Sequence, residues 1–74
     1  MTQAQKHFNK LNFEYHEYKY LEEFVNFELG MEITFYKDTR QINISTFGRT
    51  DNIPYNLMIE IIKITELRKR ELEW

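Results

Sequence analysis

Apolar and polar residues alternate most regularly between residues 31 and 47, in the stretch MEITFYKDTRQINISTF. A period of two is typical of β-strands that bury one face. A two-residue turn at Asp38-Thr39 would place Phe35 opposite Ile42, so the stretch predicts a β-hairpin, although a longer loop stays open because Asp-Thr is a weak turn signal. Its apolar face would comprise Met31, Ile33, Phe35, Ile42 and Ile44.

The first residues predict a short helix with a capping box at its start. Thr2 and Gln5 have the spacing at which each side chain can bond the other residue's backbone N–H. Ala4, Phe8 and Leu11 follow a helical period and would lie on one face. This segment therefore begins as an amphipathic helix that needs an apolar surface to cover.

Residues 13–29 allow two interpretations. In the preferred one the helix stops near Asn12, and residues 14–20 and 24–29 are strands joined around residues 21–23. The second strand would alternate apolar Val25, Phe27 and Leu29 with polar residues. Together with the hairpin, these strands would form a three- or four-stranded antiparallel meander.

The alternative is one long helix over residues 3–29, followed by the hairpin 31–47. No Gly or Pro interrupts residues 3–29, and Gly30 could cap the end of such a helix. However, aromatic residues would then lie on both faces of the helix. The sequence leaves this alternative open.

The last part of the chain predicts a helix over residues 53–73. Asp51 or Asn52 could cap it, with Pro54 in its first turn, where a missing N–H costs nothing. Its apolar face comprises Leu57, Met58, Ile61, Ile62, Ile64 and Leu67. The expected fold is thus α+β, a single domain over residues 1–74 with the long last helix packed on the sheet.

Size and composition narrow the ways in which such a chain gains stability. A 74-residue chain buries only a modest core, and this one has no cysteine for disulfides. His7 and His16 stand alone, so neither a metal nor another cofactor is expected. Aromatic residues make up 16% of the chain, which favours a dense core and homodimerisation. The absence of cysteine, signal peptide and membrane span predicts a cytoplasmic protein.

Negative charge gathers in the middle of the chain. Residues 14–32 hold six Glu against Lys19, a balance of −5, within a chain of net charge −2. This segment also holds several tyrosines, and Tyr residues ringed by charge are common in protein interfaces. We expect it to bind a partner with a basic surface, without membrane contact and without direct nucleic-acid binding. The candidate contact residues are Glu14, Tyr15, Glu17, Tyr18, Glu22, Glu23, Glu28 and Glu32.

Reactive motifs are scarce. The sequence has no cysteine nucleophile, nucleophile elbow, P-loop or dinucleotide fingerprint, so we expect a non-enzymatic protein. One short motif suggests a specific partner. Gln41, Ile44 and Phe47 have the Gln-x-x-Ile-x-x-Phe spacing of peptides that dock on replication sliding clamps, although Ile44 is more simply explained as a core residue of the sheet.

Residues at the start of the chain, in the central hairpin and at the end of the chain form one pattern: Phe8, Leu11, Asn12, Phe13 and Glu14; Glu32, Ile33, Phe35, Arg40 and Ile42; and Glu71, Leu72, Glu73 and Trp74. This pattern resembles small, mostly uncharacterised phage and prophage proteins from low-GC Gram-positive bacteria. Asn12 and Glu73 depart from that pattern, because both stand where the related proteins have glycine. The resemblance implies a phage origin and a helix, meander, helix fold, but no activity.

The sequence therefore predicts a phage-type protein that acts in the host cell by binding and inhibiting a host protein. A DNA-associated target follows from the acidic bias, since spaced carboxylates can imitate DNA phosphates, and the sliding clamp is the specific candidate. The alternative is a structural or accessory phage protein that forms a homodimer through its aromatic surface, which would comprise Tyr15, Tyr18, Tyr20 and Phe24.

Overall fold

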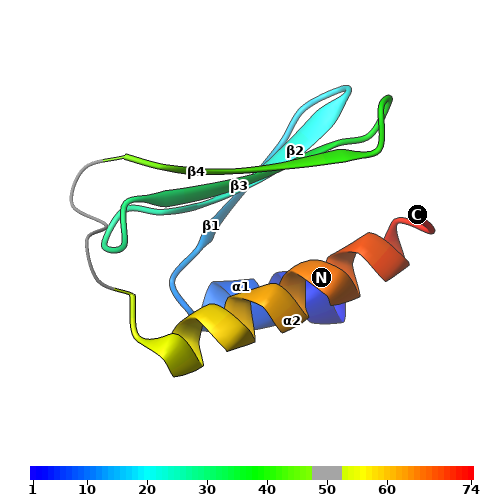
Figure 1. The fold of residues 1–74 in the computed structure, drawn as a ribbon. Helices are drawn as coiled ribbons and strands as arrows, with labels where there is room; N and C mark the ends of the chain where they lie inside the picture. The colour runs from blue at the N-terminus through cyan, green and yellow to red at the C-terminus, as the bar shows by residue number, and fades with distance from the viewer. Residues whose placement is uncertain (48–52) are drawn as a thin grey trace.

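Two helices and a four-stranded sheet make up the part of the chain that the computed structural model describes, residues 1–47 and 53–74 (Figure 1). The α+β prediction with a short first helix is confirmed, and the alternative of one helix over residues 3–29 is wrong. The elements are α1 (Gln3–Lys10), β1 (Glu14–Glu17), β2 (Leu21–Asn26), β3 (Met31–Tyr36), β4 (Gln41–Thr46) and α2 (Tyr55–Glu71).

The predicted capping box starts α1. The Thr2 hydroxyl accepts a hydrogen bond from the Gln5 amide at 3.3 Å, and the Gln5 side chain accepts one from the Thr2 amide at 2.8 Å. The helix ends because Asn12 adopts a left-handed conformation, with φ of 69°. Asparagine tolerates this conformation better than most residues, and it ends the helix as a glycine would.

A buried asparagine fastens the end of α1 to the sheet. The Asn26 side-chain amide donates to the Leu11 carbonyl at 2.8 Å, and its oxygen accepts from the Leu29 amide at 2.8 Å. Asn26 is buried, so these bonds satisfy polar groups that would otherwise be costly to bury. They connect the first loop with the turn between β2 and β3.

The sheet is an antiparallel meander in the order β1-β2-β3-β4, and both helices lie against the same face of it (Figure 1). We call this the helix face, and the other side the open face. No element in residues 1–47 or 53–74 covers the open face. None of the helices in these residues is long and apolar enough to cross a membrane.

The predicted pairing of the last two strands is confirmed. Phe35 lies opposite Ile42 and Ile33 opposite Ile44, and these side chains point to the helix face. The turn is longer than the predicted two residues, because the strands end at Tyr36 and resume at Gln41. The last residue of this turn, Arg40, is left-handed with φ of 55°, and this four-residue loop keeps the same register.

The boundaries predicted for the first two strands are wrong. The chain turns at residues 18–20 rather than 21–23, and β2 ends at Asn26. Phe27 therefore lies in a turn and is 66% exposed, where a buried strand position had been expected. The residues of β2 that point to the helix face are Glu22, Phe24 and Asn26, and Val25 points to the open face.

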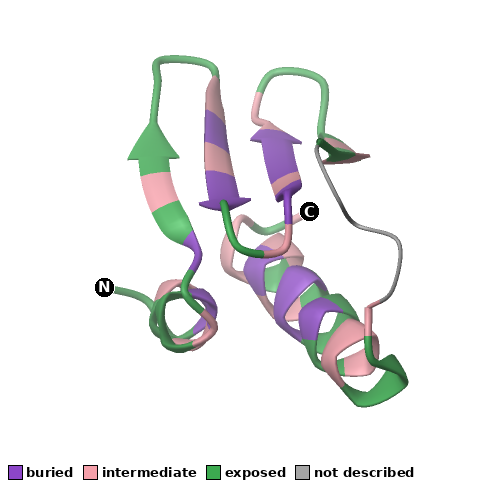
Figure 2. Ribbon diagram, turned by 90° about the vertical axis from the view of Figure 1, so that its left-hand side faces the viewer, coloured by how far each residue is buried: buried purple, intermediate pink, exposed green. Residues whose placement is uncertain are grey.

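Aromatic rings fill the space between the helix face and the helices. Phe24 is at the centre of this core, with its ring centroid 4.3 Å from that of Phe8 and 5.8 Å from that of Phe35. The ring centroids of Phe8 and Phe13 lie 5.2 Å apart, and those of Phe35 and Trp74 lie 6.1 Å apart at the other end of the core. Buried residues accordingly follow β2, β3 and the sheet-facing side of α2 (Figure 2).

Helix α2 is shorter than the predicted helix over residues 53–73, because it begins at Tyr55 and ends at Glu71. Pro54 occupies the N-cap position rather than the first turn, and the helix ends at Glu71. The predicted caps Asp51 and Asn52 lie outside the described residues. Of the predicted apolar face, Ile61 and Ile64 are buried, whereas Ile62 is 48% exposed.

The left-handed residue at the end of α1 gives a first prediction. Replacing Asn12 with Ala should lower the free energy of unfolding by about 1 kcal/mol, because a Cβ without a polar group disfavours positive φ, whereas Asn12→Gly should change it little. Urea unfolding followed by circular dichroism measures both. Asn9→Ala, at an exposed helical position, is the control; equal losses for Asn9→Ala and Asn12→Ala would contradict the prediction.

Candidate functional site

The predicted contact residues divide between the two faces of the sheet. Glu14, Glu23 and Glu32 lie on the open face, each on a different strand. This arrangement follows from the register, since Val25 of β2 lies opposite Glu14 of β1 and opposite Glu32 of β3. Neighbouring strands lie about 4.8 Å apart, so the backbones at Glu14 and Glu32 are about 10 Å apart across Val25.

Glu23 completes this acidic group from the next row of the open face. It precedes Val25 by two residues on β2, and its neighbours across the strands are His16 and Thr34. The strand positions of the open face include no Lys or Arg; the remaining ones are Leu21, Tyr36, Gln41, Asn43 and Ser45. Three carboxylates thus share a surface without a permanent cation on its strands.

The local contacts of these carboxylates are one exposed ion pair and one partly buried hydrogen bond. The His16 imidazole lies 3.4 Å from a Glu14 oxygen, with both side chains largely in solvent. The Thr34 hydroxyl donates to Glu32 at 3.2 Å. Across the described residues, no group of three or more His, Cys, Asp or Glu side chains is placed to hold a metal ion. The open face is therefore arranged as a charged surface and not as a metal centre.

Two exposed tyrosines border the acidic group at the turn between β1 and β2. Tyr18 is 53% exposed and Tyr20 57% exposed, and the Tyr18 hydroxyl donates to Glu23 at 3.4 Å. Together with Lys19 and Leu21 they line a shallow hollow beside Glu23. The predicted combination of tyrosine and glutamate therefore exists at this end of the sheet.

Other predicted contact residues lie elsewhere. Glu17 belongs to the helix side of β1 and forms an ion pair with Lys37 at 3.2 Å. Glu28 is exposed in the turn between β2 and β3, and Tyr15 is half-buried against Phe24, with ring centroids 5.1 Å apart. The structure does not bring these three residues together with the acidic group. The aromatic surface expected for self-pairing is also smaller, because Phe24 is fully buried.

The largest difference from the predicted set of contact residues concerns Glu22. It was predicted as a contact residue, but it is fully buried and bound by Arg68 of α2. The Arg68 guanidinium donates to both carboxylate oxygens, through Nε at 2.5 Å and through Nη2 at 2.6 Å. A buried carboxylate needs such a partner, because desolvation strongly disfavours an unpaired charge. Glu22 therefore holds the sheet to α2 and takes no part in a surface.

Further groups extend this ion pair into a network. The Tyr15 hydroxyl donates to Glu22 at 3.2 Å, and Arg68 Nη1 donates to Glu71 at 3.1 Å. Glu71 also accepts the Ala4 amide at 3.1 Å, which connects α2 with the first turn of α1. No buried side-chain nitrogen or oxygen of the described residues is without a partner. The network thus joins both helices and the sheet.

The electrostatics of the network follow from its burial and its charges. Hydrogen bonds to Glu22 raise the pKa of Arg68 against the opposing effect of desolvation, so the guanidinium stays charged. Burial favours the neutral form of Glu71, but hydrogen bonds from Ala4, Thr2 and Arg68 outweigh it and lower the pKa of this carboxyl. Burial, followed by the charges of Glu22 and Glu17, raises the pKa of Tyr15 to about 12.

The sequence contains a signal for the burial of Arg68 in its spacing from the apolar residues of α2. Arg68 follows Ile64 by four residues and Ile61 by seven, which places it on the buried stripe of the helix. A charged residue on such a stripe requires an opposite charge on the surface it covers. Because Arg68 stands beside Lys69 and Arg70, the sequence also fits a basic helix end in which all three side chains lie in solvent.

The sliding-clamp spacing of Gln41, Ile44 and Phe47 lies on β4 and the residue after it. Gln41 points to the open face and Ile44 to the helix face, since side chains alternate along a strand. The folded chain therefore does not present these residues as one docking motif.

The buried ion pair gives a second prediction. Glu22→Leu and Arg68→Met should each lower the free energy of unfolding by about 3 kcal/mol or more, because each leaves a buried charge without its partner. The double variant should be more stable than either single variant, since it buries no charge in place of the pair. Urea unfolding of the four proteins tests this, and additive losses would contradict it.

The raised pKa of Tyr15 gives a third prediction. The folded state holds the phenol proton more tightly than the unfolded state does, so this stabilisation is complete below pH 10 and is lost as the pH rises from 10 to 12. The wild-type free energy of unfolding should fall by about 1 kcal/mol more than that of Tyr15→Phe over this interval, which is less than the full effect of such a shift because solvent screens the partly exposed phenol. Denaturant unfolding at several pH values measures it; parallel pH profiles would contradict it.

Comparison with known proteins found no matching family model, no matching curated protein and no matching solved structure.

Proposed function

We propose that this chain is a non-enzymatic, phage-type binding protein whose open sheet face contacts a basic surface of a host protein and blocks it. The observation that carries the proposal is the placement of Glu14, Glu23 and Glu32 together on a strand surface without Lys or Arg. Carboxylates on one surface create a combined negative electrostatic potential, which attracts a cationic partner and raises its association rate.

The dimensions of the open face suit a protein partner. Four strands about 4.8 Å apart and up to six residues long give a surface of roughly 400 Å². The tyrosine-lined hollow at the turn between β1 and β2 extends it. A standard interface takes roughly 800 Å² from each partner, so the open face and this hollow could form its centre. Tyr18 and Tyr20 would supply the anchors and the carboxylates the orientation.

The partner class follows from charge and from the resemblance to phage proteins. Proteins that bind DNA carry basic surfaces, and an acidic sheet of fixed spacing can occupy such a surface in place of DNA. The replication sliding clamp, which surrounds DNA, is the specific candidate. In this proposal the chain works in the host cytoplasm and inhibits by occupying the DNA-binding surface.

Charge reversal on the open face tests the proposal. Glu23→Lys with Glu32→Lys should reduce binding to a purified sliding clamp from a low-GC Gram-positive bacterium at least tenfold, because two attractive charges become repulsive. Biolayer interferometry with the immobilised clamp measures the affinity, and rising salt should weaken the wild-type complex. Affinity purification from host lysate with both proteins extends the test to other DNA-associated partners.

The matched control is Glu60→Lys with Glu73→Lys, which changes the net charge equally at exposed positions on and after α2. This variant should bind as the wild type does. Equal weakening by both double variants would show that only net charge matters, and would refute a role for the open face. Recovery of no DNA-associated protein from lysate, with no clamp binding, would refute the partner class.

A further inference from the structure

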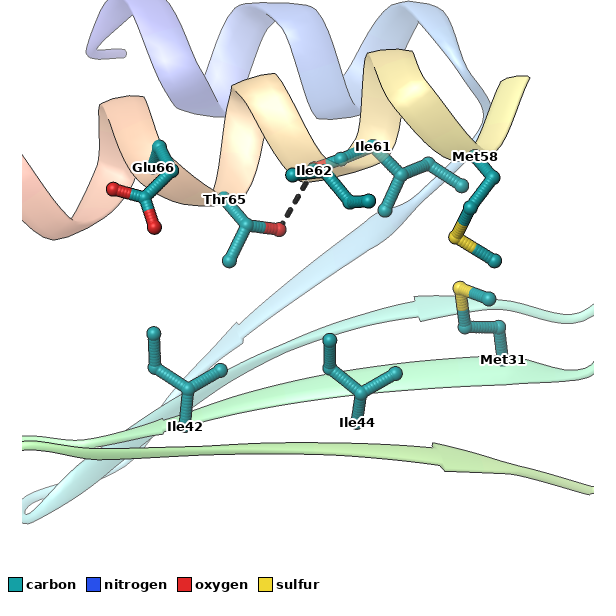
Figure 3. Close-up of a pocket in the computed structure, with 8 residues that line it drawn as sticks. All are labelled: Met31, Ile42, Ile44, Met58, Ile61, Ile62, Thr65 and Glu66. Carbon is teal, nitrogen blue, oxygen red and sulfur yellow. Dashed lines mark hydrogen bonds between the residues drawn. The ribbon is translucent and has the colours of Figure 1, made fainter. Parts of the chain in front are cut away.

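An apolar groove runs between β4 and α2, on the side of the molecule opposite β1 (Figure 3). Its volume is about 280 Å³, and its lining from the sheet is Met31, Ile42 and Ile44. The helix lines it with Met58, Ile61, Ile62, Thr65 and, at one end, Glu66. Ile44 is 53% exposed and Ile62 48% exposed, on opposite walls of the groove. Two large aliphatic side chains are therefore left half in solvent beside the last strand.

The backbone of β4 offers hydrogen-bonding groups at the same place. Strand β4 is at the edge of the sheet, with β3 on its inner side. The Phe47 amide donates to the Gly30 carbonyl at 2.7 Å, so in an antiparallel ladder the bonds to β3 come from residues 41, 43 and 45. The N–H and C=O groups of Ile42, Ile44 and Thr46 consequently point to the outer edge.

The two edges of the sheet differ in charge. Strand β1 is four residues long and carries Glu14 and Glu17, whose negative charges oppose pairing with the same strand of a second copy. Strand β4 has six residues, none of them charged and none of them proline. Proteins usually protect an exposed edge with such residues, and β4 has neither. Like-charge repulsion therefore blocks self-pairing at β1 but not at β4.

We infer that β4 and the groove beside it are the interface with a second copy of this chain. The two β4 strands would pair antiparallel about a twofold axis perpendicular to the sheet, forming one eight-stranded sheet. Such an axis keeps the helices of both copies on the same side, so helix-face residues of β4 meet the same residues of the partner. Ile42 and Ile44 of both copies then share one apolar layer, with Ile62 beneath it.

The expected size of this interface makes the dimer weak. An edge of six residues is about 20 Å long, and a strand layer with a helix beneath it is about 20 Å high, which gives roughly 400 Å² of wall from each copy. This is about half of the roughly 800 Å² that each partner contributes to a standard interface, so a weak, reversible dimer with a dissociation constant in the micromolar range or above is expected. The open face stays free in the dimer, and the inference is independent of the proposed function.

Sedimentation equilibrium over a range of concentrations tests the inference on the full chain. The wild type should show a monomer–dimer equilibrium, and Ile44→Lys should raise its dissociation constant at least tenfold by placing two ammonium groups at the seam. His16→Lys on β1, the other edge, is the matched control and should leave the constant unchanged. A monomer at millimolar concentration, or equal effects of both variants, would overturn the inference.

Hydrogen exchange of the wild-type backbone gives a readout that needs no variant to fold. At high concentration the amides of Ile42, Ile44 and Thr46 should gain protection, whereas residues 41, 43 and 45 should be protected at every concentration. Uniform protection along β4, without dependence on concentration, would overturn the inference. Open-ended oligomers in the same samples, or pairing only with an added extended peptide, would likewise replace the twofold dimer.

Discussion

The structure depends on one buried ion pair between the sheet and the last helix. Glu22 has no exposed surface, and Arg68 neutralises it from α2 with two short hydrogen bonds. A chain of 74 residues has little apolar area with which to offset a misplaced charge. Because the pair also recruits Tyr15, Glu71 and the start of α1, the two ends of the sequence are held to the same strand.

The same pair explains which parts of the fold the sequence could predict. Alternation of apolar residues correctly predicts the pairing of β3 with β4, where Phe35 lies opposite Ile42. The same alternation does not identify β2 correctly, because the buried face of this strand contains the polar residues Glu22 and Asn26. The pattern therefore predicts the turn at residues 21–23 and a buried strand position for Phe27, whereas the turn lies at residues 18–20 and Phe27 is exposed. The residues around Glu22 show no pattern for its burial, because its partner is 46 positions away, and only the place of Arg68 on the buried stripe of α2 indicates the pair.

The candidate site was predictable to a similar extent and for the same reason. The acidic bias of residues 14–32 was evident, but the face occupied by each carboxylate depends on strand register. Once the turn lies at residues 18–20, Glu14, Glu23 and Glu32 share the open face while Glu17 and Glu22 do not. In a four-stranded sheet with helices on one side, the helix face stabilises the chain by packing against the helices. The open face remains available for contact.

Both chain ends belong to the layer of helices. Thr2 lies within 3.4 Å of Arg68, and the ring of Trp74 rests against Phe35 on the helix face. The open face is on the far side of the sheet (Figure 1). A fluorescent label or a second domain fused ahead of Met1 would consequently project away from the carboxylates, and such a fusion could report binding in living cells without covering the surface it is meant to observe.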